Sequence, residues 1–103
     1  MDRIDFSECF DKLKSDVFTT VRKYSIDNVA KYLDLNKIFD VYVKGNYYCK
    51  AEVTGIDTLS GDDIDEDFLK EDTMVDGKID YEWYNKILGM GNCLILTFKK
   101  VVE

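Results

Sequence analysis

Two stretches of alternating apolar residues meet at a short turn, and this pattern limits the folds open to the chain more than any other. The first stretch contributes Phe39, Val41 and Val43, and the second contributes Tyr47, Cys49, Ala51 and Val53. Since side chains along a strand point alternately to opposite faces, each series would lie on one face of its strand. Gly45-Asn46 between them suits a tight turn, because glycine readily adopts positive φ angles. The pattern therefore predicts a β-hairpin.

The rest of the chain mixes strand patterns with helix patterns. Strands are predicted at 17–23, 38–44, 47–57 and 92–102. Helices are predicted at about 6–15, 63–71 and 80–88, with another starting after Ser25 and a turn at Asp76-Gly77. This order of short elements, in a chain long enough for one core of moderate size, predicts a single α+β domain over residues 1–103. We expect a small curled β-barrel with short flanking helices.

The predicted helices depend on the spacing of their apolar residues. The first would contain Phe6, Cys9, Phe10, Leu13 and Val17 at helical spacing, with Asp5 and Glu8 as a capping box. The second would have Ser25 as its N-cap and Ile26, Val29, Ala30 and Leu33 as its apolar face. The helix at 80–88 would bury Trp83, Tyr84, Ile87 and Leu88, and end at Gly89 and Gly91. The final strand is apolar on both faces around Cys93, Ile95 and Leu96, as a central strand would be.

The strand at 17–23 carries polar side chains where a purely structural strand would carry apolar ones. Phe18, Thr20 and Arg22 would share one face, and Thr19, Val21 and Lys23 the other. An arginine beside a threonine suits the binding of an anion or of a nucleobase edge. The structural alternative is an edge strand, in which threonine is favoured and the arginine pairs with a carboxylate.

Charge is distributed unevenly along a chain whose net charge is −7. Residues 1–50 contain nine basic and eight acidic side chains, whereas residues 51–103 contain five and thirteen. Most of the acidic excess lies in the segment 62–72, which has the pattern of a solvated, charged helix and is a poor match to a calcium loop. Without a basic run, tight sequence-independent binding of nucleic acid is disfavoured, whereas a site for one nucleotide is not.

Cysteine and histidine usage limits the chemistry further. The chain has three widely spaced cysteines, Cys9, Cys49 and Cys93, and no histidine. This predicts no zinc site, no bound cofactor and no histidine base, and three small buried thiols in a reducing compartment. No apolar run reaches the roughly 20 residues of a membrane helix, and the start of the chain lacks a signal peptide. We therefore expect a soluble cytoplasmic protein with no membrane partner.

Five motifs occur in an order that is typical of one family. They are Thr20-Val21-Arg22, Ala51-Glu52-Val53-Thr54, the acidic segment ending Lys70-Glu71-Asp72-Thr73-Met74, the helix with Trp83 and Tyr84, and Leu94-Ile95-Leu96-Thr97-Phe98. Together they cover nearly the whole chain, which resembles the ASCH domain, a member of the PUA-like superfamily of small β-barrels. The sequence from Phe18 to Tyr24 looks closest to archaeal or archaeal-virus members.

The resemblance implies binding of RNA or nucleoside-like ligands in a cleft on the barrel. Some bacterial members are amidohydrolases of acetylated cytidine, whose catalytic set is a lysine, a strand threonine three residues later and a carboxylate. The threonine matches Thr20 and the carboxylate matches Asp72, or Glu71 if the alignment shifts by one. The lysine position is Val17, which cannot act as nucleophile or base. Lys14 or Lys23 would need a different geometry.

Three functions follow as hypotheses. The first is a non-catalytic ASCH-type module that binds RNA or a nucleotide-like ligand through Thr20, Arg22, Lys23 and Asp72. The second is an amidohydrolase of modified nucleosides that uses the same pocket with a displaced lysine. The third is a protein-interaction or decoy role, in which the acidic segment 62–72 occupies a basic surface of a protein partner.

Overall fold

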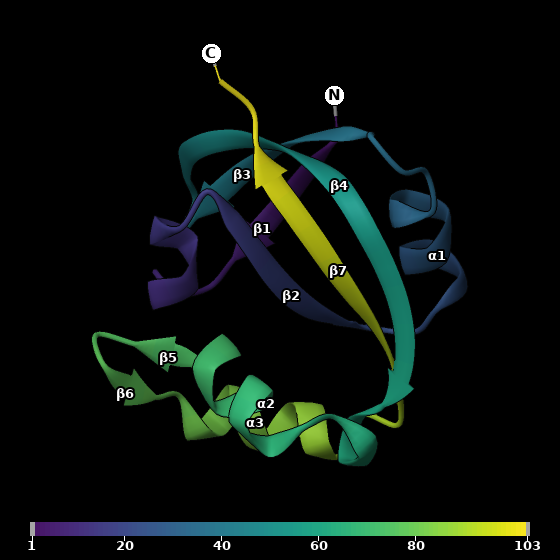
Figure 1. The fold of residues 1–103 in the computed structure, drawn as a ribbon, viewed down its shortest axis with the longest axis vertical. Coiled ribbons are helices and arrows are strands. Elements are labelled where there is room, and N and C mark those ends of the chain that lie inside the picture. Colours follow the sequence, from purple (N-terminus) through teal and green to yellow (C-terminus); the bar gives the residue numbers. More distant parts are fainter. Residues whose placement is uncertain (1, 103) are drawn as a thin grey trace.

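The computed structural model describes residues 2–102, and its largest element is a five-stranded sheet curled into a half-barrel (Figure 1). The strands are β1 (Arg3–Phe6), β2 (Val17–Lys23), β3 (Ile38–Val43), β4 (Asn46–Ser60) and β7 (Asn92–Lys100). Their spatial order is β1-β3-β4-β7-β2. β1 runs parallel to β3, and the other neighbouring pairs are antiparallel. β1 and β2 are therefore the two edges of the sheet.

Short helices and a small hairpin accompany the sheet. The helices are α1 (Ile26–Tyr32), α2 (Glu66–Asp72) and α3 (Tyr81–Leu88), with 3-10 turns η1 (Asp11–Lys14) and η2 (Gly61–Asp63). The small hairpin is β5 (Met74–Val75) and β6 (Lys78–Ile79), with its turn at Asp76-Gly77 as predicted. In Figure 1, α2, α3 and this hairpin gather together below the sheet, apart from α1. The predicted α+β class and curled sheet are confirmed, in the form of a half-barrel.

The β3–β4 hairpin forms, with its turn one residue earlier than predicted. The turn residues are Lys44 and Gly45, with φ angles of 51° and 82°, the positive values that this kind of hairpin turn requires at both positions. A register shift between Val41 and Tyr42 then places Tyr47 opposite Tyr42. Tyr47 is exposed as a result, so the prediction that it belongs to the buried series is wrong. Bulges shift the alternation in this way, and sequence spacing alone does not reveal them.

The predicted helix at 6–15 is wrong. Residues Arg3–Phe6 form strand β1, in which alternate residues Ile4 and Phe6 are buried, and only Asp11–Lys14 form a 3-10 turn. Phe10 and Leu13 are buried as expected, whereas Cys9 and Val17 are exposed. Pairing with β3 provides this short segment with strand hydrogen bonds, and tertiary pairing outweighs local helix propensity.

The other helices form where predicted but bury different side chains. Ser25 caps α1, because its hydroxyl accepts a hydrogen bond from the Asn28 backbone N–H at 3.1 Å. Its predicted apolar face is wrong in part: Val29 is half-buried against the core, but Ile26, Ala30 and Leu33 are exposed, and Tyr32 is the buried residue of the helix. In α3, Ile87 is buried, Trp83 and Tyr84 are half-buried, and Leu88 is exposed.

Two hydrophobic clusters hold these elements together. The larger fills the half-barrel and contains the rings Phe18, Tyr32, Phe39 and Phe98. The smaller joins the sheet to α2 and α3 through Val21, Ile64, Leu69, Ile87 and Cys93. β7 lies between β4 and β2 and supplies both clusters, as its apolar faces predicted. The half-buried Trp83 packs against both clusters, so α3 is fixed to the half-barrel.

Candidate functional site

Two pockets lie beside β2, and the predicted site residues divide between them. The first, called here the Arg22 pocket, has a volume of about 380 Å³ and is lined by Asp5, Phe6, Ser7, Phe10, Lys12, Thr20, Arg22, Lys44, Gly45 and Trp83. The second, called the Asp72 pocket, has a volume of about 510 Å³ and is lined by Asp11, Lys12, Ser15, Val17, Phe18, Thr19, Phe68, Glu71, Asp72 and Met74. Thr20 and Arg22 thus lie in one pocket and Asp72 in the other, while Lys23 is exposed and lines neither.

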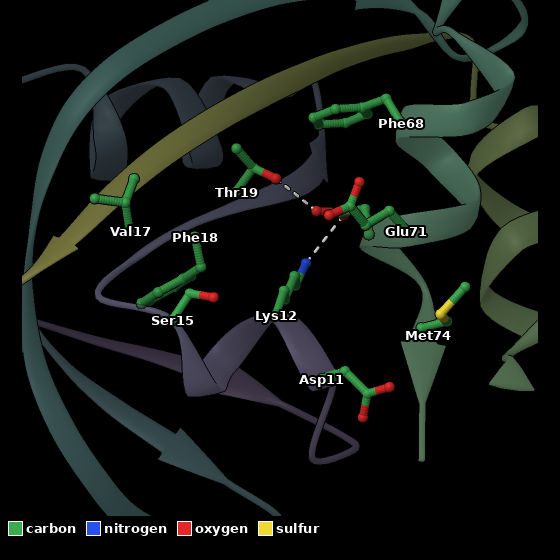
Figure 2. A pocket seen from close by; sticks show the side chains of 10 residues that line it. Asp11, Lys12, Ser15, Val17, Phe18, Thr19, Phe68, Glu71 and Met74 are labelled. Carbon is green, nitrogen blue, oxygen red and sulfur yellow. Dashed lines mark hydrogen bonds and ion pairs between the residues drawn. The ribbon is translucent and has the colours of Figure 1, made fainter. Parts of the chain in front are cut away.

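Asp72 forms a buried polar cluster at the C-terminal end of α2. The Thr19 hydroxyl donates to one carboxylate oxygen, Oδ1, at 2.6 Å, and the Lys12 ammonium group donates to the other, Oδ2, at 2.9 Å. In Figure 2, dashed lines mark these two bonds, one from Lys12 of η1 and one from Thr19 of β2. The side chains of Lys12 and Asp72 are 8% and 1% exposed. The cluster therefore joins α2 to the N-terminal half of the chain with an ion pair out of water.

Lys12 lines both pockets, and its charge is held among aromatic rings. Its amine lies 5.5 Å from the centre of the Phe6 ring and 5.2 Å from that of Phe10. Burial lowers the pKa of Lys12; the charge of Asp72 raises it, and that of Arg22 lowers it further. The pKa of Lys12 is lowered overall, because burial disfavours the ammonium charge more than the Asp72 carboxylate favours it. The ion pair with Asp72 fixes the position of the Lys12 amine.

Arg22 connects the two edge strands of the sheet. One terminal nitrogen of its guanidinium donates to the backbone carbonyl of Asp5 in β1 at 3.0 Å. The guanidinium carbon lies 5.0 Å from the centre of the Phe6 ring. Burial lowers the pKa of Arg22, against the opposing charges of Tyr32 and Asp5, yet arginine stays protonated in proteins. Within residues 2–102, its Nε is buried and has no hydrogen-bond partner.

The two pockets carry opposite charge. Among the described residues, the charged groups that line the Arg22 pocket are three cations and one carboxylate, namely Lys12, Arg22, Lys44 and Asp5. Those that line the Asp72 pocket are one cation and three carboxylates, namely Lys12, Asp11, Glu71 and Asp72. In a chain of net charge −7, the Arg22 pocket is thus a local positive site, and a concave site of one sign concentrates ligands of the other.

The sequence interpretation missed Lys12. Lys14 and Lys23 were expected as the lysines nearest to the site, and both are exposed and line neither pocket. In a helix over 6–15, Lys12 would lie off the face of Phe6, Phe10 and Leu13, and so in solvent. The short 3-10 turn instead directs it towards α2. The hydroxyl that reaches Asp72 is that of Thr19, and the hydrogen bond of Lys12 goes to Asp72 rather than to Thr20.

The three cysteines differ in how deeply they are buried. Cys93 is buried and Cys49 half-buried, but Cys9 is exposed, so the prediction of three buried thiols is wrong for Cys9. Within residues 2–102, the structure contains no group of three or more cysteine and carboxylate side chains placed to hold a metal ion. In the same part of the chain, none of the helices has the length and apolar character needed to cross a membrane.

Comparisons with protein-family models, with curated proteins and with solved structures found no match to this chain. The site is therefore interpreted from its own geometry. Two features define it: the Lys12–Asp72–Thr19 cluster, whose polar groups bind one another, and the positive Arg22 pocket beside it.

Proposed function

We propose that this chain is a small, non-catalytic binding module of the ASCH type, with a PUA-like fold, for RNA or a nucleotide-like ligand held in the Arg22 pocket. The observation that carries the proposal is the small number of hydrogen bonds that the Arg22 guanidinium donates within residues 2–102. A guanidinium has five N–H donors, and within residues 2–102 one hydrogen bond from it is present, to the Asp5 carbonyl. The group is held beside a pocket with most of its donors unused.

The lining of the Arg22 pocket supports this choice of ligand. Its volume of about 380 Å³ lies in the lower part of the range of small-molecule sites. Phe6 and Phe10 are buried at the base of the pocket, whereas Trp83 is half-buried at its wall and supplies an aromatic surface on which any nucleobase can stack. Arg22 and Lys12 supply positive charge for a phosphate or a carbonyl oxygen, and the Thr20 hydroxyl adds one hydrogen bond.

Two of the predicted ligand-binding residues lie apart from this pocket. Lys23 is at the surface, where its backbone carbonyl accepts a hydrogen bond from the side chain of Asn28. Asp72 faces the neighbouring pocket and is bound by Lys12 and Thr19. Direct contact of either residue with a ligand stays a prediction. For Asp72 the geometry favours an indirect part, in which it positions Lys12 at the wall between the pockets.

The test is chemical-shift mapping of the labelled protein with nucleosides, nucleotides and short RNAs. We expect the largest amide shifts at Thr20–Arg22 and at Phe6–Phe10, because these backbone segments surround the pocket. Arg22→Ala should abolish the shifts at a fixed ligand concentration, whereas the control Lys99→Ala should keep them, since Lys99 is exposed and lines neither pocket. Shifts confined to the Lys31–Lys50 surface would contradict the proposal.

A second candidate, an amidohydrolase of modified nucleosides, is favoured by one observation. The three kinds of group that the resemblance requires do meet in the Asp72 pocket, but with Lys12 in place of Val17 and Thr19 in place of Thr20. The lowered pKa of Lys12 is a change that favours a lysine nucleophile or base. Against this candidate, the Lys12 amine is bound to Asp72 in a buried ion pair, which directs it away from a substrate.

Turnover of acetylated cytidine separates the two candidates. We expect none by the native chain, and a gain of activity in Val17→Lys, because Val17 also lines the Asp72 pocket. Native turnover that is lost in Lys12→Met, with Lys14→Met as the matched control, would establish the hydrolase instead. Lys14 belongs to the same 3-10 turn as Lys12, but it is exposed and lines neither pocket.

A third candidate function is binding of a basic protein partner through the exposed carboxylates of the acidic segment. In the segment 62–72, six of them are exposed: Asp62, Asp63, Asp65, Glu66, Asp67 and Glu71. Such a surface suits a basic partner, although a solvated helix has the same appearance. Capture of a basic protein by the native chain but not by the Asp62/Asp63/Asp65/Asp67 neutralised variant would favour this reading over the Arg22 pocket.

A further inference from the structure

Two cations in the Arg22 pocket lie against one aromatic ring. The Arg22 guanidinium carbon is 5.0 Å from the centre of the Phe6 ring, and the Lys12 amine is 5.5 Å from it. Each uses one hydrogen bond to hold its position, Arg22 to the Asp5 carbonyl and Lys12 to Asp72. Among residues 2–102, these are the hydrogen bonds that the two side chains donate, so both are fixed on the same wall with further donors unused.

The carboxylate in the same pocket does not cancel this charge. Asp5 is bound at 2.6 Å by Arg3, and both side chains are about half exposed, outside the buried part of the site. Lys44 adds a third cation, more than half exposed and 3.4 Å from Glu8. Asp72 is buried against Lys12 and offsets its charge, whereas within residues 2–102 no ion pair involves Arg22. With Lys44 at its rim the pocket keeps a net positive charge, so it suits a ligand group that carries more than one negative charge.

A phosphate monoester is the group that fits these cations. It carries about −1.5 to −2 charges at neutral pH and three strong acceptor oxygens, whereas a phosphodiester within an RNA strand carries one charge. A planar guanidinium binds two such oxygens side by side, and an ammonium group binds a third as a point charge. A carbonyl oxygen of a base would use only one of these donors.

The remainder of the molecule disfavours a long nucleic acid. Residues 51–103 carry thirteen acidic and five basic side chains, and strand-length binding needs a row of cations to displace counterions from successive phosphates. A compact ligand with one terminal phosphate meets only the pocket.

We infer that the ligand of the Arg22 pocket is a nucleotide with a terminal phosphate monoester, held between Arg22 and Lys12 with its base against Trp83. This inference rests on the proposed function and narrows it. It applies equally to a free mononucleotide and to the phosphorylated end of a short RNA, since both present the same group.

The experiment compares matched probes on the native chain by calorimetry. They are AMP, CMP, GMP and UMP, their four nucleosides, inorganic phosphate, and one RNA hexamer with and without a 5′-phosphate. We expect at least one monophosphate to bind about tenfold or more tightly than its nucleoside, and inorganic phosphate to compete with it. Binding of the phosphorylated hexamer as tightly as the mononucleotide would identify the RNA end as the source, and weaker binding would identify the free mononucleotide.

Variants of the lining residues test whether the preference for the monophosphate over its nucleoside comes from the Arg22 pocket. Arg22→Gln should remove most of the preference for the monophosphate, and Lys44→Gln should remove a small part of it. Lys12→Gln leaves Asp72 buried without a cation, so the double variant Lys12→Gln/Asp72→Asn is the one to measure, and it should also lose the preference. Equal binding of nucleosides and monophosphates by the native chain would overturn this inference and leave the proposed function standing. Failure of every probe to bind would overturn both.

Discussion

The two pockets share one lysine but use their charged groups in opposite ways. In the Asp72 pocket, both carboxylate oxygens of Asp72 accept hydrogen bonds, and its partners Lys12 and Thr19 come from different elements. In the Arg22 pocket, the part of the chain that the structure describes gives the guanidinium one hydrogen bond, to the Asp5 carbonyl. A polar cluster whose groups satisfy one another holds a fold in one arrangement, whereas donors left unused beside a pocket are available to a ligand. We therefore assign stability mainly to the first pocket and binding to the second.

Loss of the Lys12 charge tests the stabilising part of this comparison and should have the largest effect. In Lys12→Met, Asp72 keeps its buried carboxylate, with a side chain 1% exposed, and loses its cation. Removal of one partner from a buried ion pair costs about 3–5 kcal/mol. We expect the free energy of unfolding, measured in urea, to fall by about that amount.

Two controls show whether the cost comes from the unpaired carboxylate. Lys14→Met changes an exposed lysine of the same 3-10 turn and should stay within about 0.5 kcal/mol of the native chain. The double variant Lys12→Met/Asp72→Leu should recover most of the loss, because two apolar side chains often replace a buried pair without cost. A double variant no more stable than Lys12→Met would show that the cluster contributes through more than this pair.

Removal of the Arg22 side chain tests the binding part. Arg22→Ala should weaken ligand binding by about 1.5–3 kcal/mol, the range of hydrogen bonds to a charged group, as measured by calorimetry. It should also lower the thermal midpoint, since Arg22 joins β2 to β1, and titrations therefore belong below the unfolding transition of the variant. The control Lys99→Ala removes an exposed cation from β7, outside both pockets, and should change affinity by less than about threefold. Equal losses in both variants would show that general charge, rather than the fixed guanidinium, attracts the ligand.

Much of the sheet could be predicted because its strands are encoded locally. The strand 17–23 has the same bounds in the structure, and β3, β4 and β7 lie where alternation placed them. β1 could not be predicted in this way. Arg3–Phe6 is four residues long, too short for a period to be read, and it becomes a strand only because β3 lies alongside. Because the strand is so short, Phe6 could also be counted with Phe10 and Leu13 in a helical series, which led to the wrong helix at 6–15.

The site was harder to predict than the sheet because it joins segments far apart in the chain. Strand alternation correctly placed Thr20 and Arg22 on the same face of β2, and both line the Arg22 pocket. Lys12 and Asp72 are 60 residues apart, and no local pattern links them. The acidic run also hid Asp72: six other carboxylates precede it in the segment 62–71, and only burial at the end of α2 distinguishes Asp72 from them.

The salt dependence of ligand affinity tests whether the ligand contacts the Arg22 pocket alone, and the expected effect is smaller. If the ligand makes one phosphate contact within the Arg22 pocket, the logarithm of its affinity should fall with the logarithm of salt concentration with a slope of about −1 or shallower. Titrations between low and physiological salt would give this slope. A slope several times steeper would mean that many phosphates are contacted, and would move the interface to the lysines between Lys31 and Lys50.

The smallest predicted effect concerns Asp5, the carboxylate of the Arg22 pocket. The hydrogen bond from Arg3 lowers the pKa of Asp5 below its ordinary value, and burial opposes this only in part. Because the folded state holds this carboxylate charged to lower pH than the unfolded state does, the contribution is fully present above about pH 4 and is lost as the pH falls through the lowered pKa. Both side chains are about half exposed, so solvent screening limits the contribution to about 0–1 kcal/mol. The free energy of unfolding should therefore fall slightly more steeply below pH 4 in the native chain than in Arg3→Ala. Identical acid profiles would mean that Arg3 does not neutralise Asp5, and the positive charge of the pocket would then be smaller than its three cations indicate.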